Sequence, residues 1–275
     1  MINLIMKKII YSVVLTFISI SSFAQTVDEI IANHIAANGG QEKLSTINTL
    51  QYTSTMKLNM MGMQIDVSSI NIIENNKLFR KNISGVMGMK GSYTLVTDTA
   101  GYISIPSVQG YGDFPGIEGG ISKMDDDKFL IAKQKLNVLE EFSALINYKE
   151  KGFAAELLGK SKIDKVECFK IKLIAADGEA SLFFIDATTY LLKQIEVSGK
   201  QISSILGIRG GPMGDMMGGR MDKQKMNLLY QSYTDTGGIK FPSKLIIQLG
   251  ASDIEIENSS IEINEPVNKK WYTAN

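Results

Sequence analysis

The chain has 275 residues, equal numbers of acidic and basic residues, and a single cysteine. A chain of this length can bury a sizeable core, as one large β domain or as two small ones. The balanced charge leaves no electrostatic footprint for nucleic acid, so we expect no nucleic-acid partner. One cysteine allows no internal disulfide, so burial must hold the fold together.

Residues 1–24 have the pattern of a secretory signal peptide. Two lysines precede an apolar run at residues 9–20 and a small-x-small cleavage site at residues 22–24. The run is too short for a membrane-spanning helix. Residue 25 is Gln25 and not the cysteine that lipid attachment needs. We therefore expect an exported, periplasmic, soluble protein that starts at Gln25 with a net charge of about −2.

The first mature element is predicted to be a short helix. Thr26 and Glu29 form a capping box, an apolar stripe follows, and the glycines at residues 39–40 end the helix. Another short helical turn is expected at residues 41–47. His34 lies on the first helix and is the only histidine, so it provides no histidine-based metal site. We interpret His34 as a structural or surface residue.

The stretch at residues 163–199 predicts an antiparallel meander of three strands. Asp177 and Gly178 separate the first two apolar runs. Such a pair is a strong hairpin signal, because a type I′ turn needs positive φ at both central residues. A polar turn then leads into a third strand at residues 191–197.

The two faces of this meander follow from the side-chain period of two along a strand. In the first run, Phe169, Ile171 and Leu173 share one face. The middle strand, residues 181–185, contains Phe184 and is apolar on both faces. A strand with two apolar faces is covered on both sides, so another part of the chain should lie over the second face.

A longer helix is predicted to begin at Ser122 and to run to about residue 147, with Asn137 as the place where it would break. Apolar residues recur at the spacing of one helix face: Phe129, Ala132, Leu136, Leu139, Phe142 and Ile146. At 1.5 Å per residue this helix would span roughly 35 Å, enough to cross most of a sheet. We expect residues 124–146 to cover the second apolar face of the meander.

Alternating apolar and polar residues predict further short strands joined by hairpins, which is a meander and not a βαβ series. These strands lie at residues 50–58, 65–72, 77–83, 92–97, 102–105, 226–233, 245–249 and 254–263. The phase of the apolar residues flips near residues 68–69 and again near residues 258–260. Each flip predicts a bulge or bend.

The sequence contains no motif of a known catalytic class: no HExxH, GxSxG, CxxC, Walker loop or GxGxxG after a strand. Adjacent acids at residues 125–127 and 140–141 fit a solvated helix face better than a glycosidase pair. Cys168 lies within a strand, which favours a partnerless structural thiol over a reactive one. We expect no enzyme activity, no cofactor and no metal, with a hydrolase as a minor alternative.

Methionine is unusually frequent, with 14 residues, and clusters with glycine at residues 60–63, 87–89 and 213–221. The last cluster lies in a Met/Gly-rich segment, residues 201–224, which we predict to be a flexible insert. The clusters fit incidental turn or core residues, an adaptable apolar binding surface, or a soft-metal site for an ion such as Cu(I).

Several segments resemble exported, Bacteroidetes-type proteins of the outer-membrane lipoprotein-sorting (LolA/LolB-like) superfamily. They are GG-x-x-KL at residues 39–44, residues 152–160, FKIKL at residues 169–173, Asp177-Gly178, FID-x-x-TYLL at residues 184–192, residues 238–242 and INEPV at residues 263–267. The resemblance covers nearly all of residues 25–275, which we expect to form one domain.

The resemblance implies an α+β, mostly β fold: a strongly curved antiparallel sheet, or unclosed barrel, with helices covering the concave face. It also implies a soluble carrier that binds a lipid or an acylated protein cargo in an apolar cavity. We expect the cavity and its helical lid to use Phe129, Leu136, Leu139, Phe142, Ile146, Phe169, Ile171, Leu173 and Phe184. The alternative is an envelope sensor or interaction domain with a self-filled cavity and a membrane-protein partner.

Overall fold

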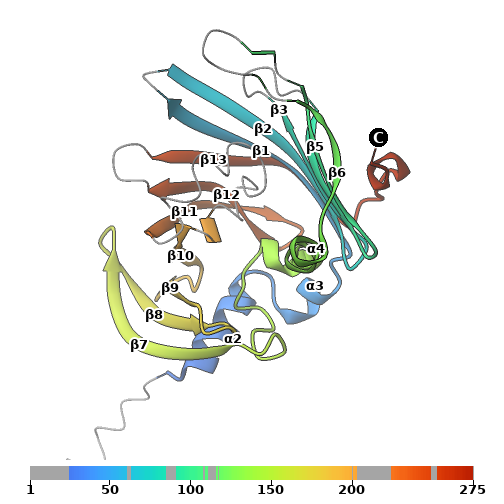
Figure 1. Cartoon of the computed structure of the whole chain (residues 1–275). Helices are drawn as coiled ribbons and strands as arrows, with labels where there is room; N and C mark the ends of the chain where they lie inside the picture. Colours follow the sequence, from blue (N-terminus) through green and yellow to red (C-terminus); the bar gives the residue numbers. More distant parts are fainter. Residues whose placement is uncertain are drawn as a thin grey trace, which may run out of the picture.

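The strands of the described residues form one 13-stranded sheet in which strands that are consecutive in sequence pair with one another. All pairings are antiparallel, and the exception to sequence order is β1 beside β13. The computed structural model describes residues 25–60, 63–84, 91–107, 109–110, 116, 118–199, 201–202, 224–248 and 253–274. The sheet curves strongly without closing, because β6 and β7 remain separate edges (Figure 1). This confirms the predicted fold class.

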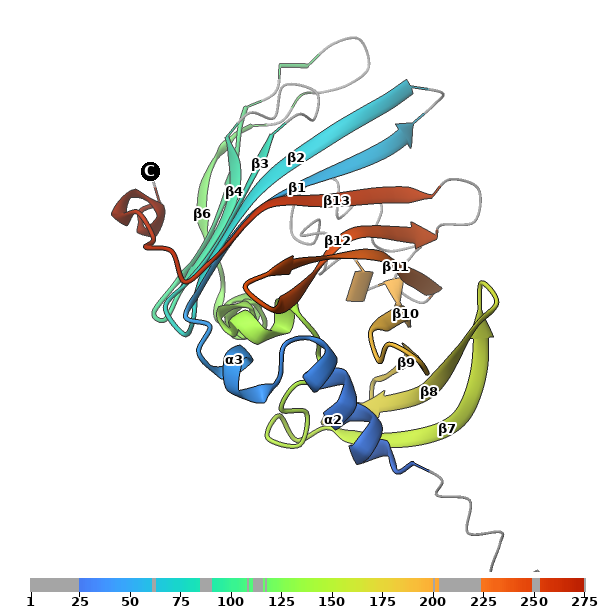
Figure 2. The same ribbon diagram turned by 180° about the vertical axis from the view of Figure 1, so that it is seen from behind.

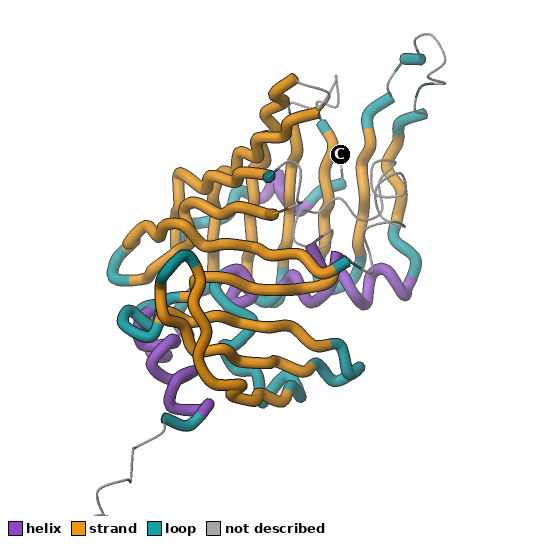
Figure 3. Tube along the Cα trace, turned by 90° about the vertical axis from the view of Figure 1, so that its left-hand side faces the viewer, coloured by secondary structure: helices purple, strands orange, loops and turns teal. Residues whose placement is uncertain are grey.

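The strands follow one another around the curve, with few helices between them (Figure 3). Their bounds are β1 Thr49–Met60, β2 Met63–Glu74, β3 Leu78–Ser84, β4 Ser92–Thr97, β5 Gly101–Ile105, β6 Gly120–Lys123, β7 Ala154–Ile163, β8 Val166–Ile174, β9 Ala180–Asp186, β10 Leu192–Ser198, β11 Lys225–Thr236, β12 Ile239–Gln248 and β13 Ile254–Ile263. The described helices include α2 Val27–Ala37, α3 Gln41–Ser45 and α4 Asp126–Ala132, and the described 3₁₀ helices are η1 Lys133–Leu136, η2 Val138–Glu141 and η3 Lys269–Tyr272.

One of the two predicted bulges is present and the other is not. The pairing of β1 with β13 shifts register beside Ser260, whose φ is +50°. In contrast, β2 pairs with β1 and β3 without any shift, so the bulge predicted at residues 68–69 is wrong. In β2 the apolar residues change face because Ser69 and Asn71 take the inward positions while Ile70 and Ile72 point outward.

The hairpin at Asp177 and Gly178 is confirmed, but its turn is not type I′. Gly178 alone has positive φ, and the Ala175 amide donates to the Glu179 carbonyl at 2.8 Å. The loop therefore has three residues and one left-handed glycine. The two-residue turn with positive φ at both positions lies instead between β7 and β8, at Asp164 and Lys165.

The predicted capping box of α2 is confirmed. The Glu29 amide donates to the Thr26 hydroxyl, and the Glu29 carboxylate accepts from the Thr26 amide. The apolar stripe of α2 buries Ile30 and Ile31 against the concave face of β8 to β10. This helix closes the lower end of the curved sheet (Figures 1 and 2).

The long helix predicted over residues 122–147 is wrong. Ser122 belongs to β6 and pairs with Ile103, and Asp125 caps the short helix α4 instead. The segment then passes through η1, an extended Asn137, and η2. The turn between β2 and β3 explains this break, because the Asn76 amide donates to the Leu136 carbonyl at 2.8 Å. A carbonyl that accepts a hydrogen bond from this turn is a weaker acceptor for the next amide of a continuing helix.

The segment lies on the concave side, as the resemblance implied, but the prediction that it covers the meander of residues 163–199 is wrong. Residues 126–141 lie inside the curve and pack on β1, β3, β4 and β12. The second face of β9 is the convex face, where Phe184 is buried. On this face Phe184 lies between its cross-strand neighbours, Lys170 of β8 and the buried Gln194 of β10, and Lys170 Nζ lies 5.7 Å from the ring centroid. A lysine stem shields the ring while its charge stays near water, so no helix is needed there.

A small second core lies outside the curve. The C-terminal residues fold back over the convex face of β2 to β4, where Trp271 and Tyr272 pack on Ile72, Leu78 and Leu95 (Figure 2). The predictions for the signal peptide and for most of the insert at residues 201–224 fall outside the described residues. So do the side chains of the three methionine clusters, although the backbones of Met60 and Met63 pair between β1 and β2.

Candidate functional site

A cavity of about 700 Å³ lies between the concave face of the sheet and the segment that holds α4, η1 and η2. This volume is within the range of small-molecule sites, roughly 300–1,000 Å³. Inward-facing residues of most strands line it, because alternate side chains of each strand point the same way. Its apolar wall includes Met56, Val67, Leu173, Phe183, Ile195, Val197, Leu228, Leu245 and Ile256.

One part of the wall is polar. Tyr52, Asn71, Lys81 and Thr94 are direct cross-strand neighbours on β1, β2, β3 and β4, so they form one row across the sheet. We call these four residues the polar row. A shorter row beside it holds Ser54 and Ser69, which are also cross-strand neighbours. The Asn71 side-chain amide joins the two rows by donating to the Ser69 hydroxyl at 3.2 Å.

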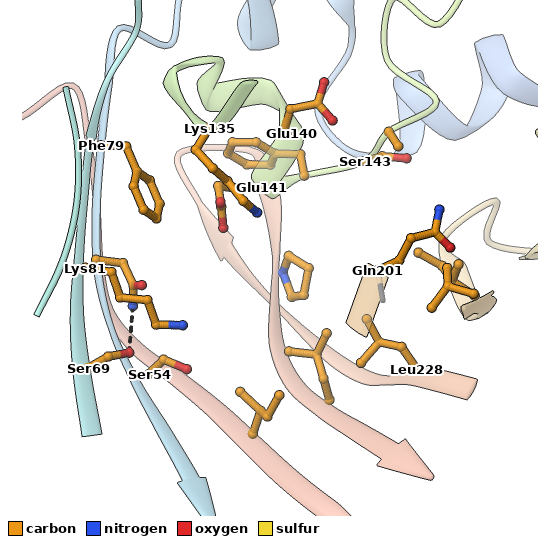
Figure 4. Close-up of a pocket in the computed structure, with 18 of the residues that line it drawn as sticks. Ser54, Ser69, Phe79, Lys81, Lys135, Glu140, Glu141, Ser143, Gln201 and Leu228 are labelled. Carbon is orange, nitrogen blue, oxygen red and sulfur yellow. Dashed lines mark hydrogen bonds between the residues drawn. The ribbon is translucent and has the colours of Figure 1, made fainter. Parts of the chain in front are cut away.

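The helical segment faces the polar row with charged groups. Lys135 of η1 and Glu141 of η2 point into the cavity from above, and Lys81 extends toward them from β3 (Figure 4). The Tyr52 hydroxyl donates to a Glu141 carboxylate oxygen at 2.7 Å. That bond ties η2 to the sheet at one end of the polar row.

The surroundings change the acidity of two groups in this row. Burial, helped by the positive charge of Lys135, lowers the pKa of Lys81 to about 8, although Glu141 opposes the shift. Burial also raises the pKa of Tyr52 well above its usual range, and Glu141 adds to that effect. Tyr52 is therefore a neutral hydrogen-bond donor, and Lys81 is a cation that can lose its proton in mildly alkaline solution.

A second group of polar residues lies beside β9 and β10 and is joined by hydrogen bonds. Gln201 donates to the Ser181 hydroxyl at 3.0 Å, and Ser198 donates to a Glu179 carboxylate oxygen at 2.9 Å. These bonds hold the residues after β10 against β9. This part of the cavity contains no lysine among its described lining residues.

Ser143 also lines the cavity and contacts the buried His34 of α2. His34 Nδ1 lies 2.8 Å from the Tyr190 carbonyl, so Nδ1 carries the proton, and Nε2 accepts from the Ser143 hydroxyl at 3.0 Å. The Ser143 oxygen in turn accepts from the Leu145 amide at 3.2 Å. The histidine thus joins α2, the turn before β10 and the segment after η2, which fits the structural interpretation of His34.

Two of the nine predicted site residues, Phe142 and Leu173, line the cavity. Six others pack in the cores around it: Phe129, Leu136, Leu139 and Ile146 beside β1 to β4, and Phe169 and Ile171 against α2. Phe184 lies on the convex face, away from the cavity.

The sequence analysis did not predict the polar row, although polar residues at inward strand positions indicate it. In β2 the inward positions hold Ser69 and Asn71 between two apolar residues, and in β3 Lys81 follows the inward Phe79 by two. Burying polar side chains costs free energy unless they form hydrogen bonds, so two or three polar residues on a buried strand face indicate a polar site within the core. The change of phase at residues 68–69 predicts a bulge instead, and β2 has none there.

The described part of the chain holds no group of three or more histidine, cysteine, aspartate or glutamate residues that could bind a metal ion. Cys168 is fully buried, and burial raises the pKa of its thiol to about 11, which disfavours the reactive thiolate.

None of the helices in the described residues is long and apolar enough to cross a membrane.

The architecture defines a class: a half-open antiparallel sheet whose concave face encloses a mostly apolar cavity under a short helical lid. No protein-family model matches the chain, and no curated protein matches it by sequence. Among solved structures it is similar to a LolA superfamily protein from Nitrosomonas europaea, with a TM-score of 0.55 and 11% identity over 91% of this chain and 98% of that one.

It is also similar to a DUF1329 family protein from Desulfovibrio piger, with a TM-score of 0.50 and 12% identity over 90% of this chain and 97% of that one. At these identities the likeness establishes the fold. The chain therefore has the LolA-like fold that its sequence segments predicted.

Proposed function

We propose that the protein is an exported, periplasmic carrier that holds the acyl chain of a lipid or of an acylated protein in its concave cavity. The observation that carries this proposal is the cavity itself, about 700 Å³ in volume and lined on most sides by aliphatic and aromatic residues. The cavity is an open space beside the packed cores. A sensor domain of the alternative kind would fill that space with its own side chains.

The energetics of such a site are adequate without any catalytic group. Each methylene buried from water contributes roughly 0.8 kcal/mol, so about ten methylenes contribute roughly 8 kcal/mol before the costs of association. Because the costs of association are subtracted from this gain, the net affinity is weaker than the micromolar value to which about 8 kcal/mol alone would correspond. A carrier must also release its cargo, for which moderate affinity is suitable.

The helical segment that covers the cavity can change position. Residues 126–141 form three short helical pieces rather than one rigid helix, and the intervening Asn137 is extended. Short pieces joined by non-helical residues can shift with less loss of backbone hydrogen bonding than a continuous helix. Leu130 and Ile131 of α4 are 70% and 58% exposed, and Ile131 lines the cavity, so α4 is loosely packed.

Native mass spectrometry of the protein purified gently from its own envelope tests the proposal. We expect a stoichiometric adduct of acyl-chain mass that organic extraction removes. A clean mass for the free protein, together with no uptake of added lipid or lipopeptide, would favour the alternative of a sensor or interaction domain.

A further inference from the structure

The hairpin of β1 and β2 carries four uncharged polar side chains together on its inward face. Tyr52 of β1 is the cross-strand partner of Asn71 of β2, and Ser54 is the partner of Ser69. All four line the cavity, and Ser54 and Ser69 are seen on its wall in Figure 4. Because the two pairs are successive inward positions, about 7 Å apart along the strands, they form one continuous patch. We call these four residues the polar block.

The inward pairs on either side of the polar block are apolar. Leu50 pairs with Ile73 in the core at one end, and Met56 pairs with Val67 at the other, where both line the cavity. The block therefore interrupts an apolar face. Each of its serines also leaves open the space that a valine or leucine side chain would fill in a packed core. The interruption thus supplies both hydrogen-bonding groups and room for a ligand.

The side chains of the polar block use only part of their hydrogen-bonding capacity. The Asn71 amide donates to the Ser69 hydroxyl at 3.2 Å, and the Tyr52 hydroxyl donates to Glu141 at 2.7 Å. Among the described residues, the side chains of Ser54, Ser69 and Asn71 make no other hydrogen bond. Asn71 and Ser69 are nonetheless only 3% and 6% exposed. Two hydroxyl protons, one amide N–H and the amide oxygen are therefore left for whatever fills the cavity.

We propose that the polar block is a subsite for the acyl carbonyl of the cargo, which is the C=O group of the ester or amide that links the acyl chain to the rest of the molecule. This inference rests on the proposed carrier function and adds the group by which the cargo is recognised. Hydroxyl and amide N–H donors match a carbonyl oxygen, which accepts hydrogen bonds and carries no charge. The acyl chain would continue from the block along Met56, Val67 and the apolar wall beyond them.

A cargo without a carbonyl group would leave the polar block unpaired. A hydrocarbon or an ether in the same space would cover the Asn71 amide and the serine hydroxyls and displace water from them without replacing its hydrogen bonds. Leaving buried donors unpaired costs more than one good hydrogen bond contributes. A site built around hydrogen bonds rejects the analogue that lacks them for this reason. The block should therefore distinguish an ester or an amide from an ether, which the apolar wall cannot do.

The test compares three uncharged ligands that share a dihydroxypropyl headgroup and a twelve-carbon chain. They are the ester 1-lauroylglycerol, the amide N-(2,3-dihydroxypropyl)dodecanamide and the ether 1-O-dodecylglycerol. Each competes with the fluorescent apolar probe N-phenyl-1-naphthylamine for the full mature protein, below the concentration at which the ligand aggregates. The ligands differ only at the linkage, so a difference in affinity reports binding of the carbonyl group.

The variants are the double substitution Ser54→Ala with Ser69→Ala, and Asn71→Leu, in which leucine has nearly the shape of asparagine. Both remove hydrogen-bonding groups without adding charge. Ser68→Ala is the matched control, because Ser68 is the next residue of β2, its hydroxyl lies 3.5 Å from that of Thr55, and it is not among the residues that line the cavity. A thermal melt checks that each variant is folded, and the serine variant carries the test if Asn71→Leu does not fold.

We expect the wild-type protein to bind the ester or the amide about tenfold more tightly than the ether, because the carbonyl oxygen gains hydrogen bonds that the ether does not. The serine double variant and Asn71→Leu should reduce this preference to about twofold or less, whereas Ser68→Ala should keep it. The tighter of the two carbonyl ligands identifies the linkage, because an amide N–H can also donate to the Asn71 oxygen and an ester has no such group.

Two kinds of result overturn the inference, and they are distinguishable. Equal affinity for the three ligands, or a carbonyl preference that the serine and Asn71 variants leave unchanged, refutes the carbonyl subsite and leaves the carrier function standing. Failure of the probe to bind, or failure of every ligand to displace it, refutes the carrier function and the subsite with it.

Discussion

The buried Nε2 of His34 lies 3.0 Å from the hydroxyl of Ser143, and this contact joins the first helix to the segment that lids the cavity. Burial lowers the pKa of His34 to about 4, below its unfolded value near 6.5. Between pH 4 and pH 6.5, His34 is therefore protonated in the unfolded chain and neutral in the folded protein.

Stability should consequently fall as pH drops from about 6.5 toward 4. The difference between the two pKa values corresponds to about 3 kcal/mol at the acidic end of this window. Urea unfolding at pH 7 and pH 4.5 measures the loss. His34→Gln should show a smaller loss over the same window, because Gln does not titrate; an equal loss would assign the pH dependence to other groups.

Ser143→Ala should destabilise the protein by about 1–3 kcal/mol, because it leaves the buried Nε2 of His34 without its donor. Urea unfolding at pH 7 gives the value. Ser143→Ala should leave acyl-chain binding intact when the protein is folded. Ester hydrolysis that disappears in Ser143→Ala would instead revive the hydrolase alternative, with Ser143 as nucleophile and His34 as base.

Ser54→Phe should block the cavity. Ser54 lines the cavity, and a phenyl ring there would occupy space that an acyl chain needs. We expect affinity for a twelve-carbon ligand to fall at least tenfold, while stability changes by less than about 1 kcal/mol because the ring enters open space. Probe-displacement fluorescence measures the affinity.

The control for this variant is Thr55→Phe, at the next residue of β1, whose hydroxyl lies 3.5 Å from the Ser68 hydroxyl and which does not line the cavity. Thr55→Phe should bind ligand as the wild type does. Equal loss of binding in both variants would mean that β1 is distorted and that the cavity was not tested.

Arg80 should anchor the C-terminal segment on the convex face. Its guanidinium carbon lies 4.1 Å from the Tyr93 ring centroid and 5.5 Å from that of Trp271, and its Nη1 donates to the carbonyls of Trp271 and Thr273 at 3.1 and 2.6 Å. Arg80→Ala should cost about 3 kcal/mol through the lost charged hydrogen bonds and ring contacts. Urea unfolding checks the value, and proteolysis should show an exposed C-terminus.

Tyr93→Phe is the matched control for Arg80→Ala. The Tyr93 hydroxyl is buried and has no hydrogen-bond partner among the described residues, so its removal should be neutral or slightly stabilising. A large destabilisation in Tyr93→Phe would show that the hydroxyl is bonded in solution, for example through water.

The sequence by itself predicts the features that depend on neighbouring residues. The capping box of Thr26 and Glu29, the left-handed Gly178 and the bulge beside Ser260 each depend on residues a few positions apart, and each is present. Alternation of side chains located most strands for the same reason. The segments that resemble the LolA-like proteins then predicted the curved sheet, which the fold confirms.

Tertiary structure decided the rest. The sequence indicated Asn137 as a break, but only the β2–β3 turn, through Asn76 and the Leu136 carbonyl, ended the helical segment there. Pairing of β1 with β13 joins residues about two hundred positions apart, beyond the reach of any local pattern. Above all, a period of two gives each strand two faces without saying which one is concave. Curvature of the whole sheet placed Lys81 and Asn71 inside with the lid charges and Phe184 outside under Lys170.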